Sequence, residues 1–281
     1  RHLISKDLAA KDTGSLITRN DEQLSIMVNE EDHLRLQNIR FGLQLKQLWQ
    51  EIDKLDDFIS ENIEYAFSED YGYLTACPTN VGTGMRCSLL VHLPAIAMIN
   101  RLEKIKSSIK SLGLTIRGYY GEGSEFFGNF FQISNQITLG VTEEETIEKI
   151  YNIARKIIEH EEDARKILMQ ESKIRLEDQI FRAYGLLQNA RIISTEETMN
   201  LLSLVRLGVD LKIITDIPIT MLNEMIVHLQ PGHLQMIYGN EIPVEKRDFI
   251  RAFLIREYFF KRKESDKSNE LNPQKNINKN D

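Results

Sequence analysis

The sequence of 281 residues contains little of what would place it in a specialised class of proteins. Its two cysteines, Cys77 and Cys87, could close only a small loop by a disulfide, and no second cysteine pair or histidine cluster indicates a metal site. No apolar run reaches the roughly 18 residues that a membrane-spanning helix needs. No basic, apolar and small-residue leader points to secretion. We therefore expect a cytoplasmic protein with reduced thiols and no protein ligands for a metal.

Basic residues are also too few for a general nucleic-acid binder. The chain has 35 Lys and Arg residues against 42 Asp and Glu residues, a formal net charge of −7, whereas a phosphate backbone binds a basic surface. With 42% hydrophobic and 27% charged residues, the composition is that of one large globular domain or two smaller ones. The chain opens on Arg1, from which we expect a processed or cut start.

The first half of the chain combines strand and helix patterns. Residues 15–29 show the apolar alternation of a β-hairpin. Helical spacing predicts a helix over residues 42–66 and another from Pro94 to Leu112. Further strands are expected at the following positions: 33–41, 71–76, 88–93, 114–120 and 129–139. Because hairpins and long returns join the strands, the predicted fold class is α+β, a mainly antiparallel sheet flanked by helices.

The second half is helical, with no convincing strand. Thr142 and Glu145 form a capping box that predicts a long helix to about residue 170. Further helices are expected over 176–187, after a cap of Ser194 with Glu197, over 221–229, and from Pro243 onward. The predicted domains are a mixed domain over 1–164, an all-helical C-terminal domain over 165–262, and a polar tail over 263–281 that we expect to be disordered.

Several polar residues in the first domain stand next to glycines or at the ends of strands. They are three arginines and two groups of carboxylates: Arg35, Arg86, Arg117, Glu30, Glu31, Asp32 and Glu122. Each has a plain explanation when taken alone, such as a solvated strand face for Arg35, and nearby Cys77 could be a small buried hydrophobe. Together they fit one chemistry, because arginines bind phosphate oxygens, glycines let a polyphosphate approach, and carboxylates hold a guanidinium. The combination indicates phosphoryl transfer to a guanidinium.

Three segments resemble, in order and spacing, the signature segments of the phosphagen kinases, or ATP:guanido phosphotransferases. They are VNEEDHLR (28–35), CPTNVGTGMR (77–86) and RGYYGEG (117–123). This resemblance covers roughly residues 1–160. Beyond it, residues 176–194, 205–211 and 247–252 are similar to the helical extension of the bacterial protein-arginine kinases of the McsB type. The resemblance implies a guanido-kinase catalytic fold followed by a helical domain for dimerisation and phosphoarginine binding.

The resemblance also implies roles for individual residues. Glu31 and Glu122 match the carboxylates that hold and deprotonate the target guanidinium, and Cys77 matches the active-site cysteine. The residues matched to the nucleotide site are His2, Arg35, Arg86, Cys87, Ser88, Leu89, Leu90, Arg117, Gly118, Tyr119, Tyr120 and Gly121. The residues matched to a second, allosteric phosphoarginine site are Arg247, Asp248 and Arg251. Glu30 and Asp32 match neighbours without an assigned role.

The sequence departs from the family pattern at three places. The usual Arg-Ala-Ser is Arg86-Cys87-Ser88, and Leu90 replaces a histidine that contacts adenine in metabolite kinases. An upstream arginine-rich nucleotide segment has no counterpart, so we expect a chain truncated at its N-terminus. Such a chain, taken alone, is expected to bind ATP weakly and to phosphorylate poorly.

The implied activity is ATP- and Mg²⁺-dependent phosphorylation of arginine side chains in proteins, which marks them for Clp-type proteolysis and regulates the stress response. The implied partners are exposed arginines of protein substrates, a zinc-containing activator (McsA), the ClpC–ClpP protease, the CtsR repressor and a second copy of the chain, with no direct nucleic acid and no membrane. Two alternatives remain: a phosphoarginine-binding adaptor with an inactive kinase half, or a kinase for free arginine. Residues 165–262 speak against the latter, because a small-molecule kinase has no evident need for them.

Overall fold

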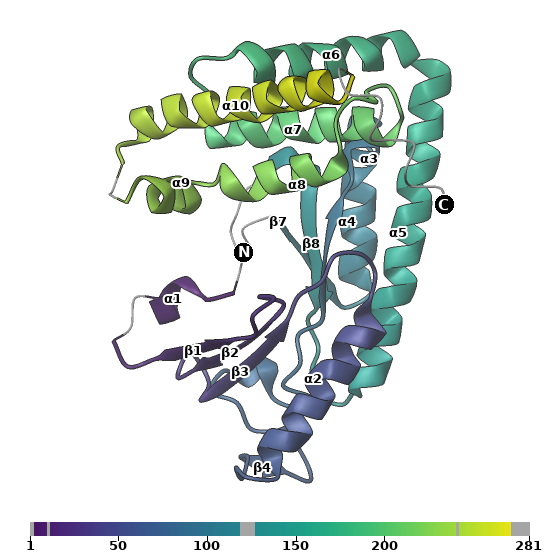
Figure 1. The fold of residues 1–281 in the computed structure, drawn as a ribbon. Coiled ribbons are helices and arrows are strands. Elements are labelled where there is room, and N and C mark those ends of the chain that lie inside the picture. Colours follow the sequence, from purple (N-terminus) through teal and green to yellow (C-terminus); the bar gives the residue numbers. More distant parts are fainter. Residues whose placement is uncertain (1–2, 10–11, 119–126, 240–241, 271–281) are drawn as a thin grey trace, which may run out of the picture. The chain divides into compact units, whose positions relative to one another are not determined.

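The computed structural model describes residues 3–9, 12–118, 127–239 and 242–270 (Figure 1). The chain divides into two compact units. The first, which we call the sheet unit, comprises residues 1–91, 100–125 and 131–160. The second, the helical unit, comprises residues 92–99, 126–130 and 161–281. Both strands and helices are therefore present, and the predicted α+β class is confirmed.

The N-terminal strands form a three-stranded antiparallel sheet in the order β1-β2-β3. Its strands are β1 (Ser15–Thr18), β2 (Leu24–Val28) and β3 (Leu34–Asn38), preceded by the short helix α1 (Lys6–Ala9). The predicted hairpin of β1 and β2 is confirmed, with Glu22 of its turn at a φ of 57°. In β2 and β3, Met27 lies opposite Arg35 and Val28 opposite Leu34. The β2–β3 turn therefore presents residues 29–33 at one end of this sheet.

A second three-stranded sheet has the order β6-β8-β7. Its strands are β6 (Ser88–His92), β7 (Leu114–Gly118) and β8 (Phe130–Asn135). The central strand, β8, is almost wholly buried, with Phe131 and Ile133 at most 1% exposed. Two short strands, β4 (Phe67–Ser68) and β5 (Gly72–Tyr73), form a separate antiparallel pair. The strand expected over 71–76 is thus reduced to β5, because the chain turns away to form the glycine-containing loop.

The helices of the first half of the chain follow the predicted periodicity, with different ends. Helix α2 (Leu45–Ser60) stops before the expected residue 66. The single helix expected from Pro94 is two helices, α3 (Pro94–Met98) and α4 (Leu102–Ser111). The break occurs at Asn100, whose φ of 58° is a left-handed conformation that ends an α-helix and that asparagine tolerates better than most residues.

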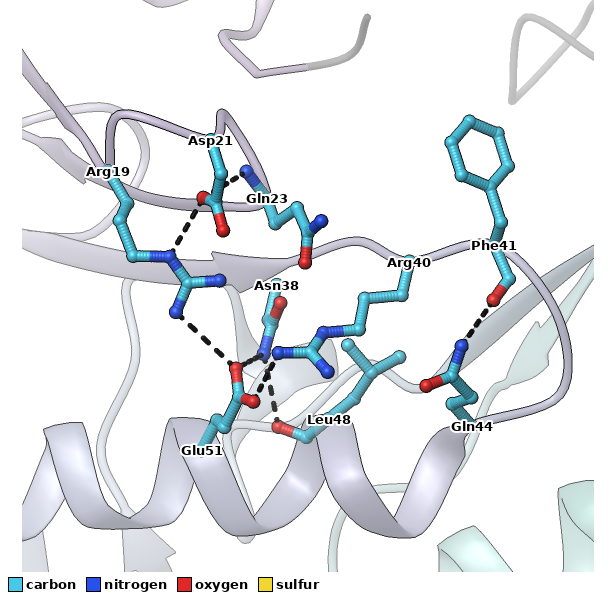
Figure 2. A network of polar contacts seen from close by, with 9 residues as sticks. All are labelled: Arg19, Asp21, Gln23, Asn38, Arg40, Phe41, Gln44, Leu48 and Glu51. Carbon is cyan, nitrogen blue, oxygen red and sulfur yellow. Dashed lines mark hydrogen bonds and ion pairs between the residues drawn. The ribbon is translucent and has the colours of Figure 1, made fainter. Parts of the chain in front are cut away.

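A network of charged side chains ties α2 to the first sheet (Figure 2). Glu51 of α2 accepts hydrogen bonds from Asn38 at 3.1 Å and from Arg40, and it pairs with Arg19 at 3.5 Å. Arg19 also contacts Asp21 in the β1–β2 turn at 2.8 Å. One carboxylate of α2 thus connects the β1–β2 turn with the segment that follows β3.

The long helix α5 (Glu143–Glu171) begins at the predicted capping box. The Glu145 amide donates to the Thr142 hydroxyl at 3.1 Å, and the Thr142 amide donates to the Glu145 carboxylate at 3.0 Å. Both donors would otherwise lack partners at the start of the helix. The predicted start of this helix is confirmed, and α5 extends from the sheet unit into the helical unit.

The helical unit consists mainly of the helices that follow α5. They are α6 (Lys173–Asn189), α7 (Thr195–Asp210), α8 (Ile219–His228), α9 (Pro231–Tyr238) and α10 (Val244–Glu270). The predicted cap of α7 is confirmed, because the Ser194 hydroxyl accepts from the Glu197 amide at 3.1 Å. Helix α9 was not predicted from the sequence, although Pro231 at its start and Gly239 after its end are typical helix boundaries.

Helix α10 continues to Glu270, beyond residue 263, where we expected a disordered tail to begin. Residues 271–281 lie outside the described residues. Within the described part of the chain, no helix is both long enough and apolar enough to cross a membrane.

Candidate active site

The loop between β5 and β6 is held from one side by Thr138. It begins with Cys77, forms a 3₁₀ turn over Pro78–Asn80 and returns at Ser88. The Thr138 hydroxyl lies 3.0 Å from the Thr79 carbonyl oxygen and 2.8 Å from that of Val81. In return, the Thr83 amide donates to the Thr138 carbonyl at 3.0 Å. The loop therefore has a defined shape although few of its side chains are buried.

Gly82 is required where this loop passes close to the backbone of Thr138. Its φ is +113°, and a Cβ atom placed on it would lie 2.2 Å from the Thr138 carbonyl oxygen. Gly82 also exchanges backbone hydrogen bonds with Tyr73, at 2.8 and 3.2 Å. A side chain would break this approach, because both the conformation and the space exclude one.

Two tyrosines connect the same loop to α2. The hydroxyl groups of Tyr65 and Tyr73 donate to the two carboxylate oxygens of Asp56, at 3.0 and 3.3 Å. The two rings meet edge to face at 5.9 Å. Burial and the neighbouring Asp56 carboxylate raise the pKa of the Tyr73 hydroxyl, so it stays a donor. Asp56 thus fixes Tyr73, and Tyr73 fixes Gly82.

The β2–β3 turn lies beside the start of the loop. Asp32 accepts a hydrogen bond from the Ala76 amide at 2.6 Å. The Asn80 side chain reaches a carboxylate oxygen of Glu31 at 3.5 Å, the long limit for such a contact. Glu31 is exposed. Ala76 and Asn80 lie on either side of Cys77 in the sequence. The contacts therefore bring the segment that carries Cys77 beside the turn that carries Glu31, although 45 residues separate Glu31 from Cys77 in the chain.

Glu30 has a supporting role in this turn. Its side chain is 7% exposed and lies 3.3 Å from Arg35, which is 47% exposed. Burial raises the pKa of the Glu30 carboxyl, but hydrogen bonds from Ser5 and the Glu31 amide, together with Arg35, outweigh burial and lower the pKa overall. Glu30 is therefore an ionised carboxylate that orients Arg35.

The other two candidate arginines lie along β8. Arg86 donates to the Ser134 hydroxyl at 3.3 Å. Arg117 of β7 stands opposite Gln132 in the antiparallel register. Because Gln132 and Ser134 are two residues apart in one strand, their side chains share a face of the sheet. The structure thus places Arg86 and Arg117 on the same face, which the sequence alone could not establish.

The two cysteines have different surroundings. The Cys77 sulfur lies 3.0 Å from the Thr79 hydroxyl at the start of the loop. The Cys87 amide donates to the side-chain oxygen of Asn135 in β8 at 2.8 Å, and the Cys87 carbonyl accepts from the Asn135 amide at 3.3 Å. Burial raises the pKa of the Cys87 thiol to about 11. Cys87 is therefore a protonated, structural thiol near neutral pH.

Some of the remaining candidates of the nucleotide site lie within the described residues and others do not. Ser88, Leu89 and Leu90 belong to β6, and Gly118 ends β7. Ser88 accepts a hydrogen bond from Gln132 at 3.3 Å, and Leu90 is 52% exposed. The other candidates lie outside the described residues: His2, Tyr119, Tyr120, Gly121 and Glu122.

In the helical unit, α10 carries the three residues matched to a second site. Arg251 is 1% exposed and donates to the Leu229 and Ile193 carbonyl oxygens at 3.0 and 2.9 Å. It also contacts Asp248 at 2.5 Å. Its Nε and one terminal nitrogen are therefore bound to backbone oxygens inside the unit, and the assignment of Arg251 to a phosphoarginine site stays a prediction. Arg247 is partly exposed.

Comparison with known proteins identifies the two halves of the chain. The family model "ATP:guanido phosphotransferase, C-terminal catalytic domain" matches residues 1–164, and "Protein-arginine kinase McsB C-terminal domain" matches residues 173–270. The protein-arginine kinase of Pelotomaculum thermopropionicum is 50% identical over 260 residues, which is 92% of this chain and 73% of that protein. The chain belongs to the protein-arginine kinase family.

Other protein-arginine kinases give the same result. The protein-arginine kinase of Halothermothrix orenii is 48% identical, and the match covers 91% of this chain and 74% of that protein. The one of Bacillus subtilis is 47% identical, and the match covers 92% of this chain and 71% of that protein. Among solved structures, the duplicated taurocyamine kinase of Schistosoma mansoni is 31% identical in sequence, with a TM-score of 0.48. The match covers 53% of this chain and 20% of that chain. As a protein-arginine kinase, the chain is an enzyme that phosphorylates arginine side chains of proteins with ATP, as the sequence predicted.

A glycine substitution tests the loop support. We expect Gly82→Ala to lower the free energy of unfolding by well over 1 kcal/mol and kinase turnover by roughly 100-fold, because the loop must move away from Thr138. Gly140→Ala is the matched control, since Gly140 also has a positive φ, +75°, but has nothing within 4 Å of its Cβ position. Thermal unfolding and arginine phosphorylation measure both effects; equal losses in the two variants would contradict the assignment.

Alkylation distinguishes the two cysteines. At pH 8 we expect iodoacetamide to modify Cys77 at least about tenfold faster than Cys87, because a thiol with a pKa of about 11 is almost entirely protonated there. Labelling of Cys87 should rise only as the pH approaches 11. Peptide mass spectrometry measures both rates, with Cys77→Ser as the control for assignment. Equal, slow labelling of both residues would show that Cys77 is an inert core thiol.

Proposed function

We propose that Glu31 and Glu122 hold and deprotonate the target arginine, and that Arg35, Arg86 and Arg117 bind the phosphates of ATP. The observation that carries the proposal is the contact of the β2–β3 turn with the glycine-containing loop, through Asp32–Ala76 and Glu31–Asn80. It places an exposed carboxylate beside the loop that begins with Cys77. Arg86 and Arg117 lie on one face of the sheet that follows this loop.

The chemistry follows from these positions. The target guanidinium is protonated in water, with a pKa above about 12, and is a poor nucleophile in that form. A carboxylate must take one of its protons as the bond from nitrogen to phosphorus forms and the bond from phosphorus to the ADP oxygen breaks. The arginines offset the charge of the transferring phosphoryl group, because such reactions depend on alignment and electrostatic stabilisation.

A divalent cation, for which we propose Mg²⁺, would neutralise phosphate charge when bound. Magnesium prefers oxygen ligands and commonly keeps substrate phosphates and water in its shell. In the described part of the site, Asp32 is occupied by the Ala76 amide and Glu30 by Arg35. The Glu31 carboxylate is exposed, contacts Asn80 only at the long limit of 3.5 Å, and would be free to approach the metal–nucleotide complex. The nucleotide, rather than a protein cluster, would hold the ion.

Cys77 is proposed to lie next to the target guanidinium. The position of Cys77 at the start of the loop, directly after Ala76, which contacts the β2–β3 turn through Asp32, supports such a contact. ATP together with an arginine substrate should then protect Cys77 from alkylation. His2, Cys87, Ser88, Leu89, Leu90, Gly118, Tyr119, Tyr120 and Gly121 complete the proposed nucleotide site.

The cellular role is proposed from the family resemblance. Phosphorylated arginines would mark proteins for the ClpC–ClpP protease in the cytoplasm, with McsA as the activator and CtsR as one target. The helical domain would form a homodimer and bind phosphoarginine. Arg247 and Asp248 are the proposed contacts, supported by the partial exposure of both. Arg251 would hold Asp248 in place through their ion pair.

Removal of the general base has a predictable effect. In the full-length kinase, we expect Glu122→Gln to lower kcat by roughly 100- to 10,000-fold, the usual contribution of a positioned base, with little change in ATP affinity. Glu31→Gln should act in the same direction. Glu64→Gln is the control, because Glu64 is an exposed carboxylate elsewhere in the sheet unit. Near-normal turnover of the Glu122 variant would remove this residue from the mechanism.

A single substitution on α10 tests the second site. We expect Arg247→Ala to keep basal phosphorylation and to abolish activation by added phosphoarginine. Asp248→Ala is less suitable, because it leaves the buried Arg251 without its carboxylate partner and should destabilise the unit. Lys246→Ala, which removes an exposed positive charge from the neighbouring position, is the control. An Arg247 variant that responds to phosphoarginine as the parent does would show that this residue is only part of the helix surface.

A further inference from the structure

The turn that leads into β8 has an unusual backbone. In residues Phe127–Asn129, Gly128 has a φ of 63° and Asn129 a φ of 56°. Two consecutive left-handed residues are unfavourable without support from neighbouring structure. A Cβ atom on Gly128 would lie 2.6 Å from the backbone oxygen of Met199 in α7. The turn therefore lies directly against α7, within the helical unit.

Two side chains of α7 supply the polar partners of this turn. Asn200 accepts a hydrogen bond from the Gly128 amide at 2.9 Å. The Ser203 hydroxyl lies 3.2 Å from the Asn129 side-chain amide and 2.8 Å from Nε2 of His92. Ser203 is fully buried, whereas Asn200 is exposed. One helix thus binds both the start of β8 and the end of β6.

The end of β6 is joined to the same turn by further contacts. The Leu93 amide donates to the Asn129 carbonyl at 2.9 Å. The His92 ring stacks on Phe130 with a centroid separation of 4.6 Å. Burial, with the positive charges of Arg206 and Arg165, holds the pKa of His92 well below its usual value, so the ring is neutral. A neutral ring can remain in this position without a counter-ion.

The chain continues from this turn into the strand that supports the proposed phosphate-binding arginines. Gln132 of β8 stands opposite Arg117, and Ser134 accepts from Arg86. A strand presents alternate residues to opposite faces, so its start and register determine where these two side chains lie. A displaced turn would therefore displace the partners of Arg86 and Arg117.

We infer that Asn200 and Ser203 are positioning residues for the kinase reaction, because they hold the Phe127–Asn129 turn from which β8 begins. The inference rests on the proposed assignment of Arg86 and Arg117 to ATP. It gives α7 a part in phosphoryl transfer that is separate from phosphoarginine binding on α10. Both residues act through the backbone and touch no reacting atom.

Asn200 provides the sharper test, because it is exposed and its truncation leaves no buried cavity. In the full-length kinase we expect Asn200→Ala to raise the KM for ATP and lower kcat, with kcat/KM for ATP reduced about tenfold. The melting temperature should stay within about 2 °C, as for most surface substitutions. Asn200→Asp keeps the acceptor oxygen and should restore kinetics close to those of the parent. Glu196→Ala, an exposed substitution in the first turn of α7, is the control for helix effects.

Hydrogen exchange reports on the turn directly. The Gly128 amide should exchange faster in Asn200→Ala than in the parent or in Asn200→Asp, because its acceptor is gone. Ser203→Ala should accelerate exchange in residues 127–135 and lower kcat/KM for ATP in the same direction. Mass spectrometry of peptides that cover this segment measures the change.

Two results would overturn the inference. One is unchanged exchange and unchanged kinetics in Asn200→Ala. The other is a loss of activity that follows a lower melting temperature and disappears on cooling, since that result shows a purely structural role. Arg86→Ala, assayed in parallel, tests the nucleotide assignment separately: an unchanged KM for ATP in that variant contradicts the assignment, whatever the Asn200 variants do.

Discussion

The hydroxyl of Thr138 is the interaction on which the shape of the active-site loop depends. It lies within hydrogen-bonding distance of two loop carbonyl oxygens, those of Thr79 and Val81, and its own carbonyl accepts from Thr83. A loop with so many polar and small residues cannot be shaped by burial of its own side chains. Its backbone groups are bound by a residue that follows β8, so the geometry of the second sheet is transmitted to the loop.

A second set of constraints lies in the helical unit. Glu161 of α5 accepts from the amides of Ala95 and Ile96 at 3.1 and 3.0 Å, and it is held in turn by Arg165 at 2.9 Å. A carboxylate at the first turn of a helix satisfies donors that otherwise lack partners. Helix α3, which directly follows β6, thus has its start fixed by α5. Helix α7 contacts residues 127–129 in the same unit, so the segments next to β6 and β8 are both bound by helices of the second half of the chain.

Local signals were enough to predict some of these features and not others. The capping box of Thr142 and the cap of Ser194 were predictable because their hydrogen bonds join residues three apart. The loop and turn segments were found because their residues stand close together in the sequence. The buried orientation of Arg251 was not predictable, since its acceptors at Ile193 and Leu229 are brought to it only by packing. The shared face of Arg86 and Arg117 likewise depends on the strand order β6-β8-β7, which periodicity does not determine.

The buried guanidinium of Arg251 has a consequence for how the helical unit opens. Arg251 belongs to α10. Its acceptors are the carbonyl oxygen of Ile193, just before the cap of α7, and that of Leu229, just after the last turn of α8. If any one of these three segments moved away alone, a charge would remain in an apolar interior with a missing partner, which is strongly unfavourable. Partial opening is therefore discouraged, and the three helices should lose their protection together as one cooperative block.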